Sequence, residues 1–214
     1  ALLRRGLEES HRGKFHALQT LAAAQDDFLT SGDRSGAALC AAALLLTGQA
    51  MSSYRRFSEH IESLAGLRDG SIKYDDRGED LLAHAGLLAG LLMFAPGDPF
   101  CDRCVDRITR LLEVELDVNL KFAAGRVALY YTEPREQREL GNRLNALIEP
   151  LMDSPELSPH RLGRWLTFRM RVAAAAKDGL QLKRAQERAR ELVRRHSEPD
   201  VAIWLAVSEF EPAL

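Results

Sequence analysis

The sequence predicts an all-α protein, a right-handed α-solenoid of about five antiparallel helix pairs. Apolar residues recur three and four positions apart, which places them on one face of a helix. No stretch alternates polar and apolar residues as a half-buried strand does. Helices rich in small residues recur about every 40 residues, a spacing typical of helical solenoids. These segments begin near Gly36, Gly78, Asp117, Leu162 and Asp200.

Turn-forming residues divide the chain into ten expected helices. Gly32-Asp33, Pro96-Gly97 and Ser154-Pro155 are typical breaks between helices. Ser158 is expected to cap a helix, with Pro159 at the first helical position, where its missing N–H costs nothing. The expected helices are 4–30, 35–47, 50–66, 78–94, 99–114, 116–131, 135–152, 159–176, 180–196 and 199–210.

The apolar stripes are clearest in the middle of the chain. One runs from Leu81 to Leu92, a second from Leu116 to Tyr131 and a third from Leu140 to Leu151. Gly86 and Gly125 lie inside these helices, where glycine costs about 1 kcal/mol relative to alanine. Close packing against a neighbouring helix is the usual reason for such a glycine, so we expect close helix contacts there.

Composition favours a globular protein without disulfide bonds. Hydrophobic residues make up 46% of the 214 residues and charged residues 28%, which suffices for a buried core. The net charge of −2 makes nucleic acid and membrane surfaces poor partners. Three cysteines fit a reduced, cytoplasmic setting. We expect a single domain over 1–214, with a long helix in 1–34 and repeats in 35–214, cut from a larger protein.

One segment resembles a known family of helical repeats. Residues 161–179 and 184–199 look like a tetratricopeptide unit. The resemblance lies in Trp165, Phe168 and Ala173 on the first helix, Asp178-Gly179 at the turn, Ala185 and Ala189 on the second helix, and Pro199 at the end. The longer spacing here is similar to the repeats of MalT-like bacterial regulators. The resemblance implies a sensor or protein-binding region in signalling or transcription regulation, with no catalytic residues.

The stretch D-P-F-C-D-R-C, residues 98–104, raises the question of cysteine chemistry. Asp98 and Pro99 are typical of a helix start, which places Cys101 and Cys104 one turn apart. A helix N-terminus can lower a thiol pKa, so a redox-sensitive pair is an alternative. A zinc site would need two further ligands, and the available Cys40 and His84 stand at no recognised spacing. Incidental cysteines at a helix start are the favoured interpretation.

No other motif indicates catalysis, a cofactor or a metal. Residues 74–80, Y-D-D-R-G-E-D, lack the alternating ligands of a calcium loop, and we expect their end to cap the next helix. The sequence contains no Walker A, G-x-G-x-x-G, G-x-S-x-G or H-E-x-x-H pattern. We therefore expect a protein that is not an enzyme.

Charge marks a possible binding face near the C-terminus. Residues 160–196 contain eleven basic and three acidic residues. Such an excess either binds an acidic partner or is simply solvated. The candidate partner-binding residues are Arg188, Arg190, Arg194 and Arg195, together with Trp204 and Phe210 of the apolar last helix.

The sequence thus predicts a non-catalytic binding or sensing module of a bacterial regulatory protein. Its groove would bind a peptide, a partner domain, a fused neighbouring domain or a small effector. A structural self-association module, forming a homodimer, is the alternative. A thiol redox switch at Cys101 and Cys104 ranks below both.

Overall fold

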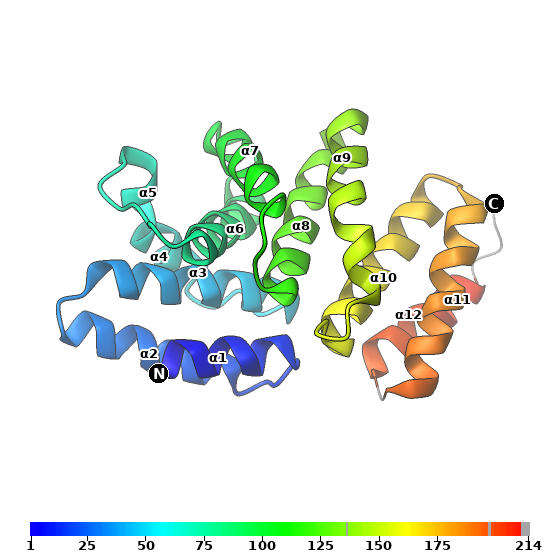
Figure 1. Cartoon of the computed structure of the whole chain (residues 1–214), viewed down its shortest axis with the longest axis horizontal. Coiled ribbons are helices and arrows are strands. Elements are labelled where there is room, and N and C mark those ends of the chain that lie inside the picture. Colours follow the sequence, from blue (N-terminus) through cyan, green and yellow to red (C-terminus); the bar gives the residue numbers. More distant parts are fainter. Residues whose placement is uncertain (136, 197, 211–214) are drawn as a thin grey trace. The chain divides into compact units, whose positions relative to one another are not determined.

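All elements in the described part of the chain are helical (Figure 1). The computed structural model describes residues 1–135, 137–196 and 198–210. The all-α prediction is confirmed for these residues. None of the described helices has both the length and the apolar character that a membrane span requires. The chain divides into two compact units, Ala1–Glu156 and Leu157–Leu214, which are described separately.

Unit 1, Ala1–Glu156, is built from successive packed helices. It contains α1 (Leu2–His11), α2 (Ala17–Thr30), α3 (Arg34–Ala50), α4 (Phe57–Ser63), α5 (Ala65–Asp69), α6 (Arg77–Phe94), α7 (Phe100–Leu112), α8 (Val118–Thr132) and α9 (Arg138–Ile148), with short 3-10 helices at Glu133–Arg135 and Glu149–Asp153. Helices α3, α6 and α8 pack in that order, and each packs against the helix that follows it, α4, α7 or α9. The repeat-like pairing expected from the sequence is therefore present in this unit.

Two glycines inside helices lie where a neighbouring helix comes very close. A Cβ atom added to Gly86 on α6 would lie 2.5 Å from Cα of Ala42 on α3. A Cβ atom on Gly125 of α8 would lie 2.5 Å from Cδ1 of Ile148 on α9. Both glycines thus allow the close helix packing that the sequence predicts.

Aspartate side chains start three of the long helices in unit 1. Asp33, Asp76 and Asp117 accept hydrogen bonds from backbone N–H groups in the first turns of α3, α6 and α8. Asp76 accepts two, from Gly78 and Glu79, each at 2.9 Å. The polar stretch 74–80 therefore supplies the cap of α6 as predicted, although the cap is Asp76 and the end of the stretch already belongs to the helix.

Two expected helices differ from the structure. The predicted helix 4–30 is two helices, α1 and α2, because Gly13 adopts a φ of 67° and turns the chain so that they pack together. The predicted helix 50–66 is two short helices, α4 and α5, which begin at Phe57 after a turn in which Ser52 and Arg56 have positive φ values.

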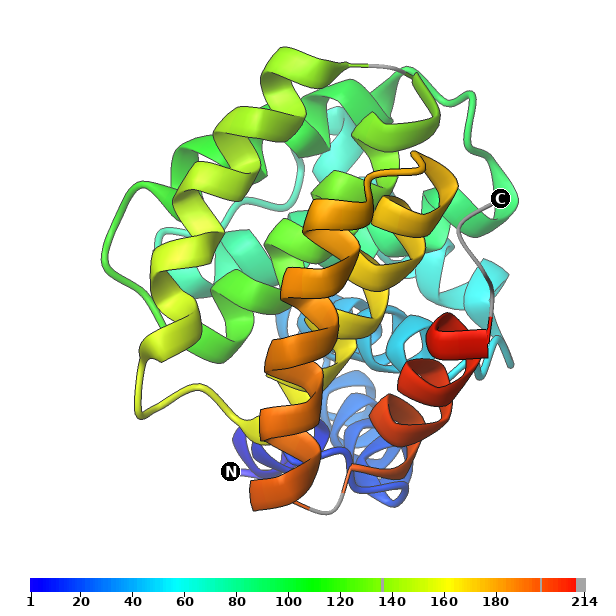
Figure 2. The same ribbon diagram turned by 90° about the vertical axis from the view of Figure 1, so that its right-hand side faces the viewer.

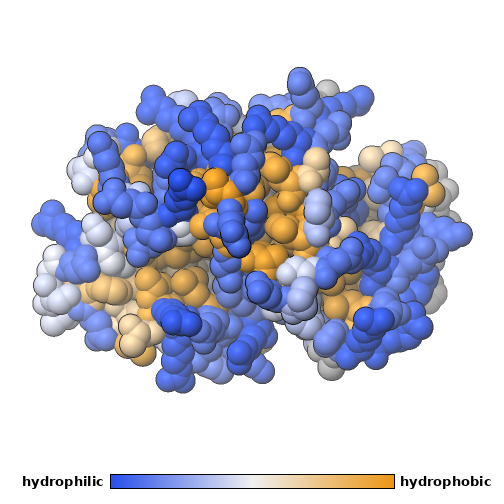
Figure 3. Space-filling view, in the orientation of Figure 1, coloured by the Kyte–Doolittle hydropathy of each residue, from blue (hydrophilic) through white to orange (hydrophobic). Residues whose placement is uncertain are grey.

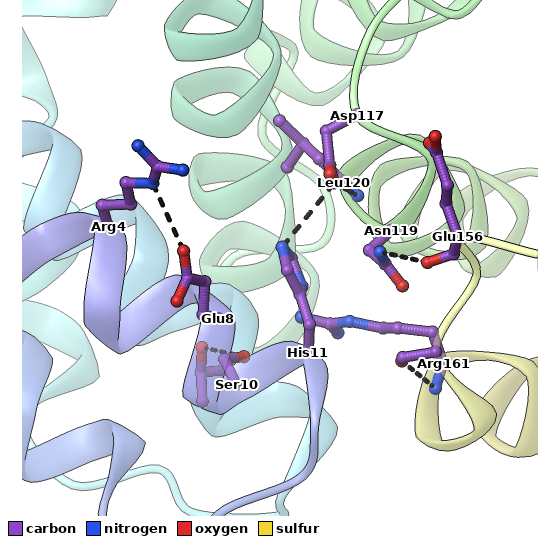
Figure 4. Close-up of polar contacts among 11 residues, drawn as sticks. Arg4, Glu8, Ser10, His11, Asp117, Asn119, Leu120, Glu156 and Arg161 are labelled. Carbon is purple, nitrogen blue, oxygen red and sulfur yellow. Dashed lines mark hydrogen bonds and ion pairs between the residues drawn. The ribbon is translucent and has the colours of Figure 1, made fainter.

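Polar contacts join helices that are distant in the sequence of unit 1. Nε2 of His11 on α1 lies 3.7 Å from Oδ1 of Asp117, the cap of α8 (Figure 4). The hydroxyls of Ser10 and Thr47 lie 2.8 Å apart and connect α1 with α3. These contacts connect α1 with α3 and with the start of α8.

Unit 2, Leu157–Leu214, contains three helices that pack against one another (Figure 2). They are α10 (Pro159–Ala175), α11 (Gly179–Arg195) and α12 (Pro199–Phe210). Oγ of Ser158 accepts a hydrogen bond from the N–H of Arg161, and Pro159 is the first residue of α10. The predicted cap and proline start of this helix are both confirmed.

Candidate functional site: an arginine-lined pocket

A pocket of about 450 Å³ opens on unit 1 at α5, α6 and α7. Its volume lies within the range of about 300–1,000 Å³ that small-molecule sites occupy. Four arginines contribute to its lining: Arg68, Arg103, Arg107 and Arg110. We call this site the arginine-lined pocket.

Helix α7 supplies three of the four arginines because its two faces differ sharply. Its buried face consists of Cys101, Cys104, Val105, Ile108, Leu111 and Leu112. Arg103, Asp106, Arg107 and Arg110 occupy the opposite, exposed face at positions i, i+3, i+4 and i+7. Burial of the apolar face therefore directs these four side chains outward together.

A buried carboxylate on α6 holds Arg107 in place. Asp80 is only 5% exposed, and its Oδ2 accepts a hydrogen bond from Nε of Arg107 at 2.7 Å. Nδ1 of His84, one helical turn along α6, lies 2.8 Å from the other oxygen, Oδ1. Burial alone raises the pKa of the Asp80 carboxyl, but the contacts with His84 and Arg107 outweigh it and hold the pKa below its ordinary value. Asp80 therefore stays ionised and orients two residues of the pocket lining.

A second aspartate fixes the other side of the pocket. Asp98 accepts a hydrogen bond from the N–H of Phe100 at 2.9 Å, and this bond lowers the pKa of its carboxyl. The same carboxylate pairs with Arg68 of α5. The guanidinium carbons of Arg68 and Arg103 each lie 5.8 Å from the centroid of the Phe100 ring. One carboxylate thus starts α7 and places Arg68 beside Phe100.

The pocket is lined by charges of both signs, and two of its four arginines have an acidic partner. Two aspartates, Asp69 and Asp106, oppose the four arginines in its lining. Among the described residues, Arg103 and Arg110 form no ion pair, whereas Arg68 and Arg107 are each paired with an aspartate. Two guanidinium groups therefore remain available to an anion from solution.

Cys101 and Cys104, the cysteines of residues 98–104, are buried in the core and do not line the pocket. Cys101 and Cys104 are fully buried free thiols, as is Cys40. Burial raises the pKa of all three, that of Cys40 to about 12. Protonated, enclosed thiols are the opposite of the exposed thiolates that redox switches use. Instead, Phe100 and Arg103 of this stretch line the pocket, and Asp98 pairs with Arg68 in its lining.

The four arginines singled out from the sequence all lie exposed on α11. Ala185, Ala189 and Leu192 form the buried stripe of this helix, so Arg188, Arg190, Arg194 and Arg195 fall outside it. Arg194 and Arg195 both pair with Glu191. Hydrophilic residues cover most of the face of α11 seen in Figure 3. The four arginines are therefore exposed, although Glu191 neutralises part of their charge.

Trp204 and Phe210 are the two aromatic candidates on α12. The guanidinium carbon of Arg171 lies 5.4 Å from the centroid of the Trp204 ring, so α10 covers part of this side chain. The side chain of Phe210 lies outside the described set. Among the described side chains of α12, Ile203 and Val207 are the large apolar ones that are exposed, at 61% and 42%.

Sequence reasoning did not identify the arginine-lined pocket. The spacing of Arg103, Arg107 and Arg110 was readable as one helical face, but Arg68 and His84 come from other helices. Only tertiary packing brings these helices together. In the described residues, no group of three or more histidine, cysteine, aspartate or glutamate side chains is placed to hold a metal ion.

Comparison of the chain with family models, curated proteins and solved structures gave no significant match.

Proposed function

We propose that this chain is a non-catalytic binding module whose arginine-lined pocket accepts an anionic effector. The observation that supports this function is the pair of exposed guanidinium groups, Arg103 and Arg110, left without ion pairs among the described residues. Arginine binds carboxylate and phosphate groups through two parallel hydrogen bonds. Asp80 and Asp98 hold the neighbouring arginines in position before any ligand arrives, which reduces the entropy cost of binding.

The sequence supports a proposal for the wider context of the module. We propose a cytoplasmic, bacterial regulatory protein in which tetratricopeptide-like helix pairs form a right-handed solenoid. An effector bound at α5, α6 and α7 would favour one arrangement of the helix pairs over others. The basic face of α11 would then meet an acidic protein partner or a fused neighbouring domain.

Thermal unfolding of the 214-residue chain tests the proposed function. Samples would contain phosphate, pyrophosphate, citrate or ATP, each compared with sodium chloride at equal ionic strength. A ligand at a hundred times its Kd stabilises the folded state by about 2.7 kcal/mol and raises the midpoint accordingly. The proposal requires such a rise for at least one polyvalent anion, which should be recovered chemically unchanged. No rise beyond that of sodium chloride, or turnover of the anion, would refute it.

Self-association is the second candidate function. It is favoured by Ile203 and Val207, which lie one helical turn apart on α12 and expose apolar surface. A second copy of the chain could cover both side chains at once.

A further inference from the structure

The arginines of α7 form a row rather than a cluster. Arg103, Arg107 and Arg110 lie at positions i, i+4 and i+7 of one exposed helical face. The rise of an α-helix separates the first from the last by about 10 Å along the axis. A single compact anion held at one end of this row would leave the guanidinium group at the other end without a partner.

In this row, an arginine that forms an ion pair lies between two arginines that form none among the described residues. Arg107, in the middle, is paired with the buried carboxylate of Asp80. Arg103 and Arg110, at the two ends, form no ion pair among the described residues. Asp106 lies on the same face between them and repels a negative charge placed at the centre. A ligand that reaches both ends satisfies more positive charge than one bound at the middle.

The lining also favours a ligand with more than one anionic group. Asp98 and Asp80 neutralise Arg68 and Arg107, so the remaining positive charge lies at the two separate arginines, Arg103 and Arg110. A ligand with two or more anionic groups can pair with both. Phe100 and Leu67 add half-buried apolar surface to the lining. This surface can cover the organic part of a ligand whose charged part lies along α7.

We infer that the arginine-lined pocket binds a polyphosphate group whose end phosphates pair with Arg103 and Arg110, which keeps its most highly charged groups away from Asp106 at the centre of the row. This inference rests on the proposed function and names its ligand class. The group belongs either to inorganic polyphosphate or to an organic polyphosphate such as a nucleoside di- or triphosphate. The organic part of a nucleotide would contact Leu67 and Phe100, whereas inorganic polyphosphate has no organic part to place there.

Calorimetric titration of the whole chain at fixed ionic strength tests the inference. The ligands are orthophosphate, pyrophosphate, tripolyphosphate, ADP and ATP. We expect tripolyphosphate or ATP to bind at least about tenfold more tightly than orthophosphate, because they reach a second arginine. ADP tighter than pyrophosphate identifies an organic polyphosphate, and equal Kd values identify the inorganic one.

Two variants and a control locate the site. Arg103→Gln and Arg110→Gln should each raise the Kd for the tighter ligand about tenfold. Both side chains are exposed, so circular dichroism and the unfolding midpoint should stay unchanged. Arg4→Gln makes the same charge change on α1, where the side chain is 88% exposed, and should leave the Kd within about twofold.

The outcomes separate this inference from the proposed function. Orthophosphate binding as tightly as tripolyphosphate and ATP, with loss in Arg103→Gln, would overturn the polyphosphate assignment but keep an anion-binding pocket. Polyphosphate binding that neither variant weakens would place the site elsewhere and overturn the inference. Absence of binding by every anion would overturn both.

Discussion

Oδ2 of Asp80 on α6 accepts a hydrogen bond from Nε of Arg107 on α7 at 2.7 Å. This contact joins a buried carboxylate to an arginine whose side chain is 46% exposed at the pocket. It connects the core of unit 1 with its candidate binding site. Changes at Asp80 should therefore alter the stability of the fold as well as the pocket.

Asp80→Asn should lower the free energy of unfolding by about 1–3 kcal/mol. The amide keeps the volume of the side chain but loses the negative charge that accepts hydrogen bonds from Arg107 and contacts His84. Urea unfolding of the whole chain measures the change. Asp106→Asn, an exposed carboxylate on α7, is the matched control and should change stability by less than about 0.5 kcal/mol. Equal effects of the two variants would contradict the role given to Asp80.

Acid should remove the contribution of Asp80 in a defined pH range. The pKa of its carboxyl is lower in the folded state than its unfolded value of about 3.9. The stabilisation is therefore fully present above about pH 5, and it is lost as the pH falls through the folded-state pKa. Between pH 5 and 2.5 the wild-type chain should lose more stability than Asp80→Asn. Parallel stability curves for the two proteins would show that this carboxyl does not titrate as described.

Gly86→Ala should destabilise unit 1 by about 1–3 kcal/mol, although alanine is the better helix former. The added methyl group would lie 2.5 Å from Cα of Ala42, so α3 and α6 would have to separate. Gly141→Ala in α9 is the matched control, because its Cβ would lie 3.6 Å from Oγ1 of Thr132. We expect the control to be neutral or to stabilise by up to about 1 kcal/mol. Denaturant unfolding compares the two, and stabilisation by both would contradict the close packing at Gly86.

The three cysteines should react slowly with a thiol reagent at neutral pH. Cys40, Cys101 and Cys104 are buried, and burial raises the pKa of each thiol, so little reactive thiolate is present. We expect no rapid phase with the folded chain and three equivalents after denaturation. Rapid reaction of two thiols in the folded chain would instead support the redox switch at Cys101 and Cys104.

Replacement of Ile203 and Val207 by serine tests the second candidate function. If two copies bury α12, the mass of the wild-type chain rises with concentration and that of Ile203→Ser/Val207→Ser stays at the monomer value. Leu29→Ser on α2, 58% exposed, is the control and should behave as the wild type. Analytical ultracentrifugation over about a hundredfold range of concentration measures this. A monomeric wild-type chain throughout that range would exclude self-association through α12.

Local chemistry determined much of this protein without any tertiary information. The three-and-four spacing of apolar residues predicted the helices, and Ser158-Pro159 and the stretch ending at Asp80 predicted helix starts that the structure confirms. Such features need only neighbours in the chain, because a cap or an apolar stripe is complete within one helix. The turn at Gly13 was missed because glycine is compatible with both a helix and a break.

Tertiary structure decided the candidate site. Arg68, His84 and Arg107 belong to three helices, and no spacing in the sequence relates them. The residues 98–104 drew attention for their cysteines, yet the fold buries both thiols and turns Phe100 and Arg103 toward the pocket. Which side of α7 faces solvent depends on which helices pack against it, and only long-range packing of apolar side chains determines that choice.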